Sequence, residues 1–124
     1  IAFASKKTGA QIRDYTAAPI YMKELERGGH EWLIEFVNQP DDLNRFKNLL
    51  DERLRELNSD YDAKRYNNMI LAEPFIQCAS KGTFDNWLKS KGKLGGQHKV
   101  PRLANNREIL EQILQFEEAL NFKA

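Results

Sequence analysis

A change of hydrophobic period near residue 40 constrains the fold more than any other feature of this sequence. Between His30 and Val37, large apolar side chains alternate with glutamates, and this two-residue period is typical of a β-strand with two different faces. Beyond Pro40, apolar residues recur every three or four positions, which predicts an amphipathic helix. The strand set is Trp32, Ile34 and Phe36 against Glu31 and Glu35, and the helix set is Leu43, Phe46, Leu50, Leu54 and Leu57. The chain must therefore combine a sheet with helices.

Glycine, proline and capping signals divide the rest of the chain into short elements. The predicted elements are a helix over Phe3–Thr8, strands at Ala10–Ala17 and Met69–Ala79, a short helix at Tyr61–Asn67, a helix capped by Thr83, and a last helix whose capping box is Asn105 with Glu108. Gly28-Gly29 reads as the turn of an antiparallel hairpin. At 124 residues the chain forms a single domain, 1–124. The expected fold class is α+β, a small, mainly antiparallel sheet of about three to four strands packed with helices.

Lys89–Arg102 differs from the rest of the chain because it combines five basic residues with three glycines and a proline and holds no acidic residue. Glycine permits positive φ and a close approach of the backbone to a ligand, whereas proline is incompatible with a helix interior. We therefore predict a cationic loop between two helices, suited to bind negative charge. Lys99 is the best placed of its cations, because Gly95-Gly96 precedes it as a hinge and Pro101 follows it as an anchor.

The charge balance argues against several classes of function. The chain has 19 basic and 18 acidic residues, so its basicity is confined to the loop, whereas a nucleic-acid binder usually carries a basic face. The loop also fails the phosphate-loop pattern Gly-x4-Gly-Lys-Ser/Thr, and it follows a predicted helix where that motif follows a strand. No apolar run is long enough to span a bilayer and no cationic leader precedes an apolar stretch, so we expect neither a membrane span nor a signal peptide.

Cysteine, histidine and tryptophan favour structural roles here. The lone Cys78 lies in an apolar segment and is predicted to be a reduced, buried core residue of a cytoplasmic protein. His30 and His98 lack further ligands at metal-binding spacing, so we predict no metal site. Trp32 and Trp87 lie on apolar stripes and are predicted core anchors.

A series of short motifs resembles one family. In order they are Asp14-Tyr15-Thr16, Ser59-x-Tyr61, Gly82-Thr83-Phe84, Gly92-Lys93, Gly95-Gly96 and Gln97-x-Lys99-x-Pro101-Arg102. Their order and spacing resemble the C-terminal domain of the auxin-responsive acyl-acid–amido synthetases, most closely the bacterial members, over nearly the whole chain. That family belongs to the adenylate-forming superfamily, in which a small C-terminal domain acts as a mobile lid on a large N-terminal domain. The resemblance implies that this chain is such a lid, excised from a larger adenylating enzyme.

The resemblance also implies a reaction and a site. The whole enzyme would use ATP and Mg²⁺ to activate a small carboxylic acid as an acyl-adenylate, and would pass the acyl group to an amine, commonly that of an amino acid. The N-terminal domain of the same polypeptide would bind the nucleotide, and the isolated lid would be inactive and bind no cofactor. The catalytic lysine of the family corresponds to Lys99 by its flanking residues and would reach the α-phosphate. The residues implied to support the nucleotide are Lys93, Gly95, Gly96, Gln97 and Arg102.

Two other functions stay open on the residues alone. One is a small nucleic-acid-binding module that uses the same cations. An aromatic and basic set, which reads more simply as a solvated helix face, would extend such a patch. That set is Tyr61, Lys64, Arg65 and Tyr66. The other is a protein-interaction module whose loop is merely solvated. Nucleic-acid binding predicts a steep salt dependence, whereas pyrophosphate exchange by the whole protein that depends on Lys99 would identify the adenylating enzyme.

Overall fold

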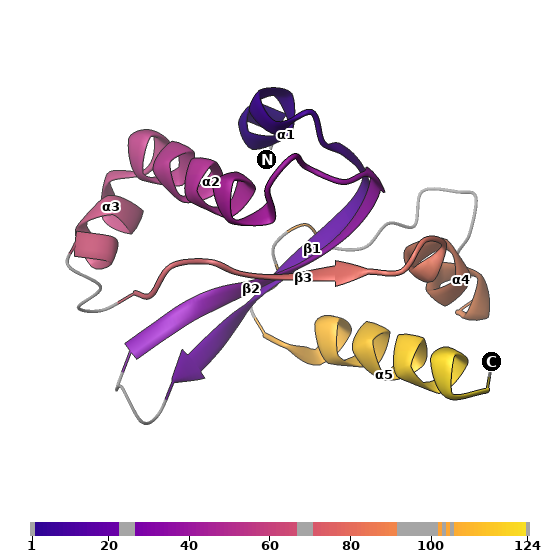
Figure 1. Ribbon diagram of the computed structural model, residues 1–124. Helices are drawn as coiled ribbons and strands as arrows, with labels where there is room; N and C mark the ends of the chain where they lie inside the picture. The colour runs from indigo at the N-terminus through magenta and orange to yellow at the C-terminus, as the bar shows by residue number, and fades with distance from the viewer. Residues whose placement is uncertain are drawn as a thin grey trace.

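The computed structural model describes residues 2–22, 27–66, 71–91, 102, 104 and 106–123. In this part of the chain the elements are α1 (Ala2–Thr8), β1 (Gln11–Met22), β2 (Arg27–Asn38), α2 (Leu43–Leu57), α3 (Ser59–Arg65), β3 (Phe75–Ala79), α4 (Thr83–Ser90) and α5 (Glu108–Lys123) (Figure 1). The α+β prediction is confirmed. Gly9, with φ of 73°, follows α1 in the left-handed conformation that is typical after a helix C-terminus.

The three strands form one mixed sheet in the order β1-β2-β3. β1 and β2 pair antiparallel, as the hairpin prediction requires, and β3 joins β2 in parallel after a crossover through α2 and α3. The predicted turn at Gly28-Gly29 is wrong, because both glycines lie inside β2, opposite Tyr21 and Ile20. The connection between the strands falls at residues 23–26, outside the described residues. Glycine is depleted in strands, which is why the sequence pattern placed the strand start at His30.

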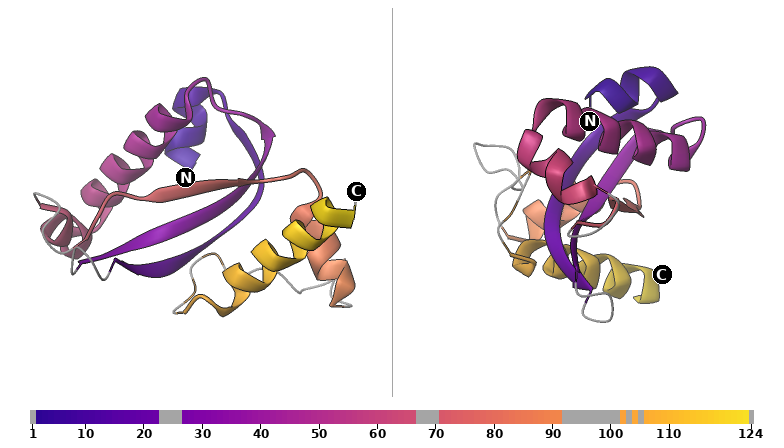
Figure 2. Two further views of the ribbon diagram at one scale, coloured as in Figure 1. Left: turned by 60° about the horizontal axis from the view of Figure 1, so that its bottom comes forward. Right: turned by 90° about the vertical axis from the view of Figure 1, so that its left-hand side faces the viewer.

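Helices cover both faces of the sheet. Figure 2 shows α1, α2 and α3 on one side and α4 and α5 on the other. The core on the first side consists of Ala4, Ala10, Ile34, Phe36, Phe46 and Leu50, and the core on the second of Ala18, Leu33, Ala79, Phe84, Trp87, Leu88, Leu110 and Ile113. β2 therefore buries both of its alternating sets. Its two glutamates, Glu31 and Glu35, are each only 4% exposed, so both need buried partners.

The amphipathic helix α2 begins at Leu43, the first residue of the predicted apolar stripe. The carboxylate of Asp42 accepts the backbone N–H of Asn44 at 2.9 Å and caps the helix. Phe46 and Leu50, from the middle of the predicted apolar stripe, are buried, whereas Leu57 at its end is exposed. The apolar stripe of α2 therefore extends beyond the part of the helix that packs on the sheet.

The two tryptophans pack as expected, but to different depths. Trp87 is buried in the core between α4, α5 and the sheet. Trp32 is half-buried and stacks on Tyr15, with 5.9 Å between the ring centroids.

The predicted buried strand at Met69–Ala79 is corrected by the structure. Of the described part of this segment, 71–79, the strand comprises Phe75–Ala79, and it lies at an edge of the sheet with Phe75 and Cys78 exposed. An apolar composition does not distinguish an edge strand from a central one. Composition reports which side chains can be buried, whereas the position in the sheet depends on how many strands pair with it. The prediction that Cys78 is a core residue is therefore wrong. Desolvation raises the pKa of its thiol, which disfavours the thiolate that a nucleophilic cysteine requires.

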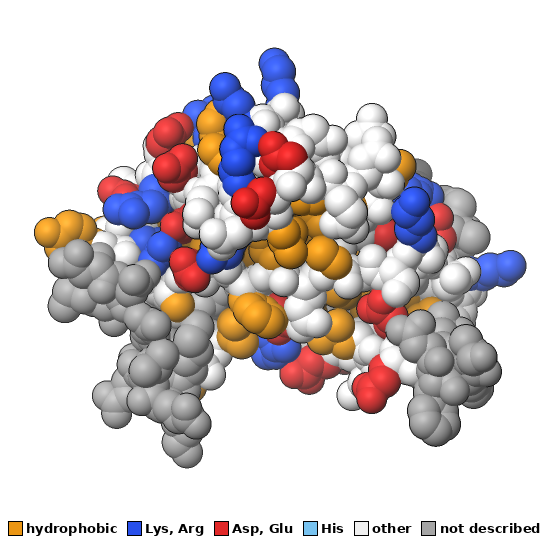
Figure 3. All heavy atoms as spheres, viewed as in Figure 1, with side chains coloured by type: hydrophobic (Ala, Val, Ile, Leu, Met, Phe, Trp, Pro, Cys, Tyr) orange, Lys and Arg blue, Asp and Glu red, His pale blue; other side chains and the backbone are white. Residues whose placement is uncertain are grey.

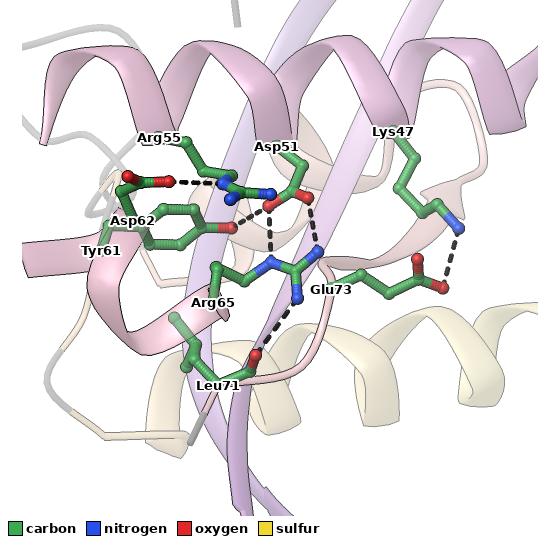
Figure 4. A network of polar contacts seen from close by, with 8 residues as sticks. All are labelled: Lys47, Asp51, Arg55, Tyr61, Asp62, Arg65, Leu71 and Glu73. Carbon is green, nitrogen blue, oxygen red and sulfur yellow. Dashed lines mark hydrogen bonds and ion pairs between the residues drawn. The ribbon is translucent and has the colours of Figure 1, made fainter. Parts of the chain in front are cut away.

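A nearly buried ion pair joins α2 to α3 (Figure 4). Arg65 donates from Nε and Nη2 to the two carboxylate oxygens of Asp51 at 2.8 and 2.6 Å, and the Tyr61 hydroxyl donates to Asp51 at 2.6 Å. Arg65 also donates to the Leu71 carbonyl at 3.2 Å. The side chains of Arg65 and Asp51 are 7% and 13% exposed. The prediction of a solvated helix face is therefore wrong for Arg65, whose side chain is buried and joins α3 to α2.

Candidate functional site: the anchors of the cationic loop

The predicted loop at Lys89–Arg102 begins too early, because α4 extends to Ser90 and includes Lys89. The described residues at its two ends are Lys91, directly after α4, and Arg102. Residues 92–101 lie outside the described residues. The same holds for the predicted site residues Lys93, Gly95, Gly96, Gln97 and Lys99. Arg102 is the predicted site residue that the structure places. The candidate site is therefore defined by the two ends of the loop and the elements that hold them.

Glu35 of β2 holds the start of the helix that leads into the loop. Its two carboxylate oxygens accept the backbone N–H groups of Gly82 and Phe84 at 2.9 and 3.0 Å. These N–H groups lie at the N-terminus of α4, where unpaired donors and the helix dipole favour an anion. Gly82 has φ of 89°, which strains any residue with a side chain. Thr83 is not the cap that the sequence predicts, because it is the first residue of α4 and the cap comes from Glu35.

We expect Glu35→Gln to destabilise the chain by about 1–3 kcal/mol, because the amide leaves one buried N–H without an acceptor and removes the charge that favours the helix N-terminus. Denaturant unfolding of the two proteins measures this difference. Glu56→Gln is the matched control, since Glu56 pairs with Arg53 on the surface of α2 and its side chain is 60% exposed. An equal loss in both variants would contradict the role of Glu35.

A β-bulge in β1 places two neighbouring side chains against two different elements, which are helix α4 before the loop and Arg102 after it. Ile12 pairs with Phe36 and Asp14 pairs with Glu35, so Arg13 is an extra residue in β1. A bulge of this kind re-aims the side chains next to it. Arg13 Nη2 donates at 2.7 Å to Asp85, in the first turn of α4. The next residue, Asp14, accepts a hydrogen bond from Arg102 at the other end of the loop.

Arg102 is held to β1 by both its backbone and its side chain. Its carbonyl accepts the N–H of Ala17 at 3.0 Å, and the N–H of Ala104 donates to the Ala17 carbonyl at 2.9 Å, which covers part of the free edge of β1. Its guanidinium donates to the carboxylate of Asp14 and lies over the Tyr15 ring, 4.5 Å from the centroid. Asp14 also accepts the N–H of Tyr15 at 2.8 Å. The Arg102 side chain is 51% exposed and that of Asp14 is 18% exposed.

Arg107 fixes the chain shortly after the loop. Its guanidinium donates to Glu31 at 2.8 Å, to the Pro19 carbonyl at 3.2 Å and to Glu111 at 3.0 Å. Gln77 of β3 also donates to Glu31. The second buried glutamate of β2 therefore joins the sheet to the start of α5.

Side chains of opposite charge are interspersed over α2 and α3, as Figure 3 shows. The ion pairs there are Arg45–Asp41, Arg53–Glu56, Arg55–Asp62 and Lys64–Asp60. A surface for nucleic acid needs basic side chains that are free to neutralise phosphates. This face of the molecule therefore gives no support to a nucleic-acid-binding function.

A cavity of about 480 Å³ lies between the β1–β2 hairpin and helices α2 and α3. Its lining includes Ile20, Trp32, Leu54 and Leu71, with His30 as a polar member. Burial lowers the pKa of the His30 imidazole, and the charge of Lys64 adds to this effect. None of the described residues Glu35, Asp14 and Arg102 lines this cavity.

The described residues supply neither a metal cluster nor a membrane-spanning helix. Over the described ranges, no three His, Cys, Asp or Glu side chains come together as a metal ion would need. Among the same residues, no helix has the length and apolar character that crossing a bilayer requires.

Comparison with known proteins identifies the family. The model of the GH3 family C-terminal domain matches residues 1–108. The chain belongs to the GH3 family. It corresponds to the C-terminal domain of that family, which confirms the resemblance to acyl-acid–amido synthetases that the motifs indicated.

Solved structures agree with this assignment at the level of the fold. The chain is similar to GH3.15 acyl acid amido synthetase, with 20% identity and a TM-score of 0.60 over 94% of this chain. It is similar to AtGH3.15 acyl acid amido synthetase in complex with 2,4-DB, with 20% identity and a TM-score of 0.61 over 92% of this chain. This GH3 domain spans 21% of each of those chains. No curated protein sequence matches it.

Sequence reasoning missed the residues that anchor the loop. The alternation in β2 placed Glu31 and Glu35 on one face, but it did not show that α4 and α5 of this GH3 domain cover that face. A signal was present in the sequence. Glu31 and Glu35 alternate with apolar residues in one strand, and Gly82 later precedes an apolar helix, so one of these carboxylates could cap that helix. Arg13 and Asp14 carried no such signal, since their roles depend on a bulge.

Proposed function

We propose that this GH3 C-terminal domain is the lid of an ATP-dependent acyl-acid–amido synthetase. In the first step, a carboxylate oxygen of the acid attacks the α-phosphorus of ATP, and the bond to the leaving pyrophosphate breaks. In the second step, an amine attacks the acyl carbon, AMP leaves, and an amide forms. We take the amine to be that of an amino acid. Membership of the GH3 family is the observation that carries this proposal.

Lys99 is the proposed catalytic residue of the lid. The first step brings two anions together, and negative charge increases on the α-phosphoryl oxygens and on pyrophosphate. An ammonium group brought into a water-poor cleft offsets that charge. Lysine suits this role because its compact charge is carried on a flexible side chain, which a moving loop can present. The proposed supporting residues are Lys93, Gly95, Gly96, Gln97 and Arg102.

The proposed partner of the loop is a nucleotide held by the N-terminal domain of the same polypeptide. We assign the sites for ATP and Mg²⁺ to that domain, together with the site for the small carboxylic acid. The lid alone is then expected to be inactive, because it supplies one cation to a site built elsewhere. A cytoplasmic location remains a prediction.

Pyrophosphate exchange by the full-length protein tests the proposal. Labelled pyrophosphate should enter ATP only when a substrate carboxylic acid is present, and a panel of aryl and alkyl acids with and without amino acids locates that substrate. Deletion of residues 1–124 should reduce the exchange to background. Exchange that persists after the deletion would contradict the role of the lid. Absence of exchange with every acid, together with salt-sensitive binding of DNA or RNA, would favour a nucleic-acid-binding module instead.

A further inference from the structure

We propose that β3 is an interaction edge that pairs with β3 of a second copy of this protein, so that two three-stranded sheets join into one across a two-fold axis. The two β3 strands run antiparallel, and the axis passes at Gln77, the central residue of Phe75–Ala79. The inference does not depend on the proposed reaction, because β3 holds none of the residues proposed for it.

β3 is the edge of the sheet that the described part of the chain leaves open. The strand order β1-β2-β3 gives β3 one neighbouring strand, β2. At the opposite edge, Arg102 and Ala104 form hydrogen bonds with Ala17 and cover part of β1. Among the residues that the structure describes, only β2 forms backbone hydrogen bonds with Phe75–Ala79. An open strand edge presents N–H and C=O groups at the spacing that another strand needs.

The composition of β3 lacks the features that keep an edge strand unpaired. Proteins protect such edges with lysine, with proline or with a bulge in the strand. Phe75–Ala79 contains no charged residue and no proline, and its pairing with β2 is regular along its whole length. Phe75 is 52% exposed, Cys78 is also exposed, and apolar side chains are visible around β3 in Figure 3. Pairing with another strand would therefore remove apolar surface from water.

β3 is complementary to itself in one register. An antiparallel pairing of two copies about Gln77 sets Phe75 opposite Ala79 and Ile76 opposite Cys78. Every residue of the strand is then paired, whereas any other symmetric register leaves residues of β3 without a partner from β3. The same register sets the large Phe75 side chain opposite the small one of Ala79, which avoids crowding between directly opposed residues.

The charged residues that flank β3 are complementary in the same register. Glu73 lies four positions before Gln77 and Lys81 lies four positions after it. The pairing therefore brings Glu73 of each copy beside Lys81 of the other copy, at both ends of the joint, where opposite charges attract. Lys47 contacts one oxygen of Glu73, but the Glu73 side chain is 58% exposed and can accept a second cation. Lys81 is exposed. This charge complementarity makes a second copy the occupant that fits the edge.

Sedimentation equilibrium of the full-length protein over a range of concentrations tests the pairing. The wild-type protein should form a dimer. Glu73→Lys or Lys81→Glu alone should raise the dissociation constant about tenfold, because each places like charges together at both ends of the joint. The double variant exchanges the two charges and should restore the dissociation constant to within about twofold of wild type. A wild-type protein that stays monomeric, single variants that dimerise normally, or a double variant as weak as the single ones would overturn the proposal.

A charge inside the strand gives a second test in the same assay. Cys78→Lys should raise the dissociation constant at least about tenfold, because a lysine on an edge strand opposes pairing. The site is exposed, so the unfolding midpoint should not change. Leu57→Lys is the matched control, since it adds the same charge at a position of α2 that is 69% exposed, and it should leave the dimer unchanged. Equal effects of the two variants would show that net charge controls association, and would overturn the proposal.

Hydrogen exchange of the full-length wild-type protein locates the interface. The amides of Phe75–Ala79 that point away from β2 should exchange more slowly at concentrations where the dimer forms, while exchange in α1 should not change. Protection that appears on dimerisation at other segments and not at β3 would overturn the proposal. Pyrophosphate exchange is measured separately, so failure of the dimer and failure of the proposed function are distinguishable.

Discussion

Replacing Lys99 by alanine in the full-length protein is expected to slow pyrophosphate exchange by about 10²–10³-fold, the loss typical of removing one preorganised charged donor from a transition state. The KM for the carboxylic acid should change little, because the lysine interacts with charge that develops on the phosphates. The measurement is the initial rate of exchange at saturating ATP and acid, with the wild-type protein assayed alongside.

Lys89→Ala is the matched control for this substitution. Lys89 is also a cation of the Lys89–Arg102 segment, but it lies exposed on α4, before the loop begins. Its removal should leave the rate within about twofold, as is usual for a surface charge away from the reacting groups. Equal rates for Lys99→Ala and wild type would exclude Lys99 from the mechanism. Equal losses in both variants would show that only the total charge matters.

Arg65→Met is expected to lower the free energy of unfolding by about 3–5 kcal/mol, because it leaves the nearly buried carboxylate of Asp51 without its charged partner. Denaturant unfolding measures the change. Arg55→Met breaks a comparable ion pair, with Asp62 at 2.6 Å, whose side chains are 40% and 50% exposed. That control should lose about 1 kcal/mol or less. Similar losses in the two variants would refute the importance of burial at Asp51.

The same network carries a pH dependence whose sign follows from Asp51. Burial alone would raise the pKa of its carboxyl group, but hydrogen bonds from Arg65 and Tyr61 outweigh burial and hold the pKa below the ordinary value of 3.8. The contribution of ionised Asp51 to the free energy of unfolding is therefore fully present above its ordinary pKa of 3.8. This contribution is lost as the pH falls through the lower pKa that Asp51 has in the folded state. The stability difference between wild type and Asp51→Asn should shrink below pH 4, and a constant difference would contradict this.

Local sequence patterns predicted the secondary-structure elements of this GH3 domain well, but they did not predict which elements contact each other. The alternation around Trp32 and the apolar stripe that begins at Leu43 depend on residues close in sequence, and each was found where expected. The predicted capping box falls partly on Asn105, outside the described residues, while Asn106 accepts the N–H of Glu108 at 3.0 Å. Boundaries of elements were less predictable than their existence, as Gly28-Gly29 inside β2 shows.

The errors share one physical cause, which is that burial of a polar or apolar residue depends on distant segments. Arg65 finds Asp51 on another helix, and Glu35 finds the N-terminus of α4 across the sheet. Cys78 is exposed because β3 lies at an edge, and strand order is not encoded in the composition of a strand. For the site, Arg102 was singled out from a motif, but its partners Asp14 and Tyr15 could be found only from the structure.

The fixed ends of the cationic loop have a consequence for how the proposed enzyme would move. Glu35 secures α4, and β1 secures Arg102, so both ends of the loop keep their places relative to one sheet. If the proposed function holds, any large displacement of these two anchor points relative to a nucleotide outside this domain requires rotation of the sheet together with them. Variants that slow such a rotation without altering the phosphate contacts should therefore be sought at the junction with the remainder of the polypeptide.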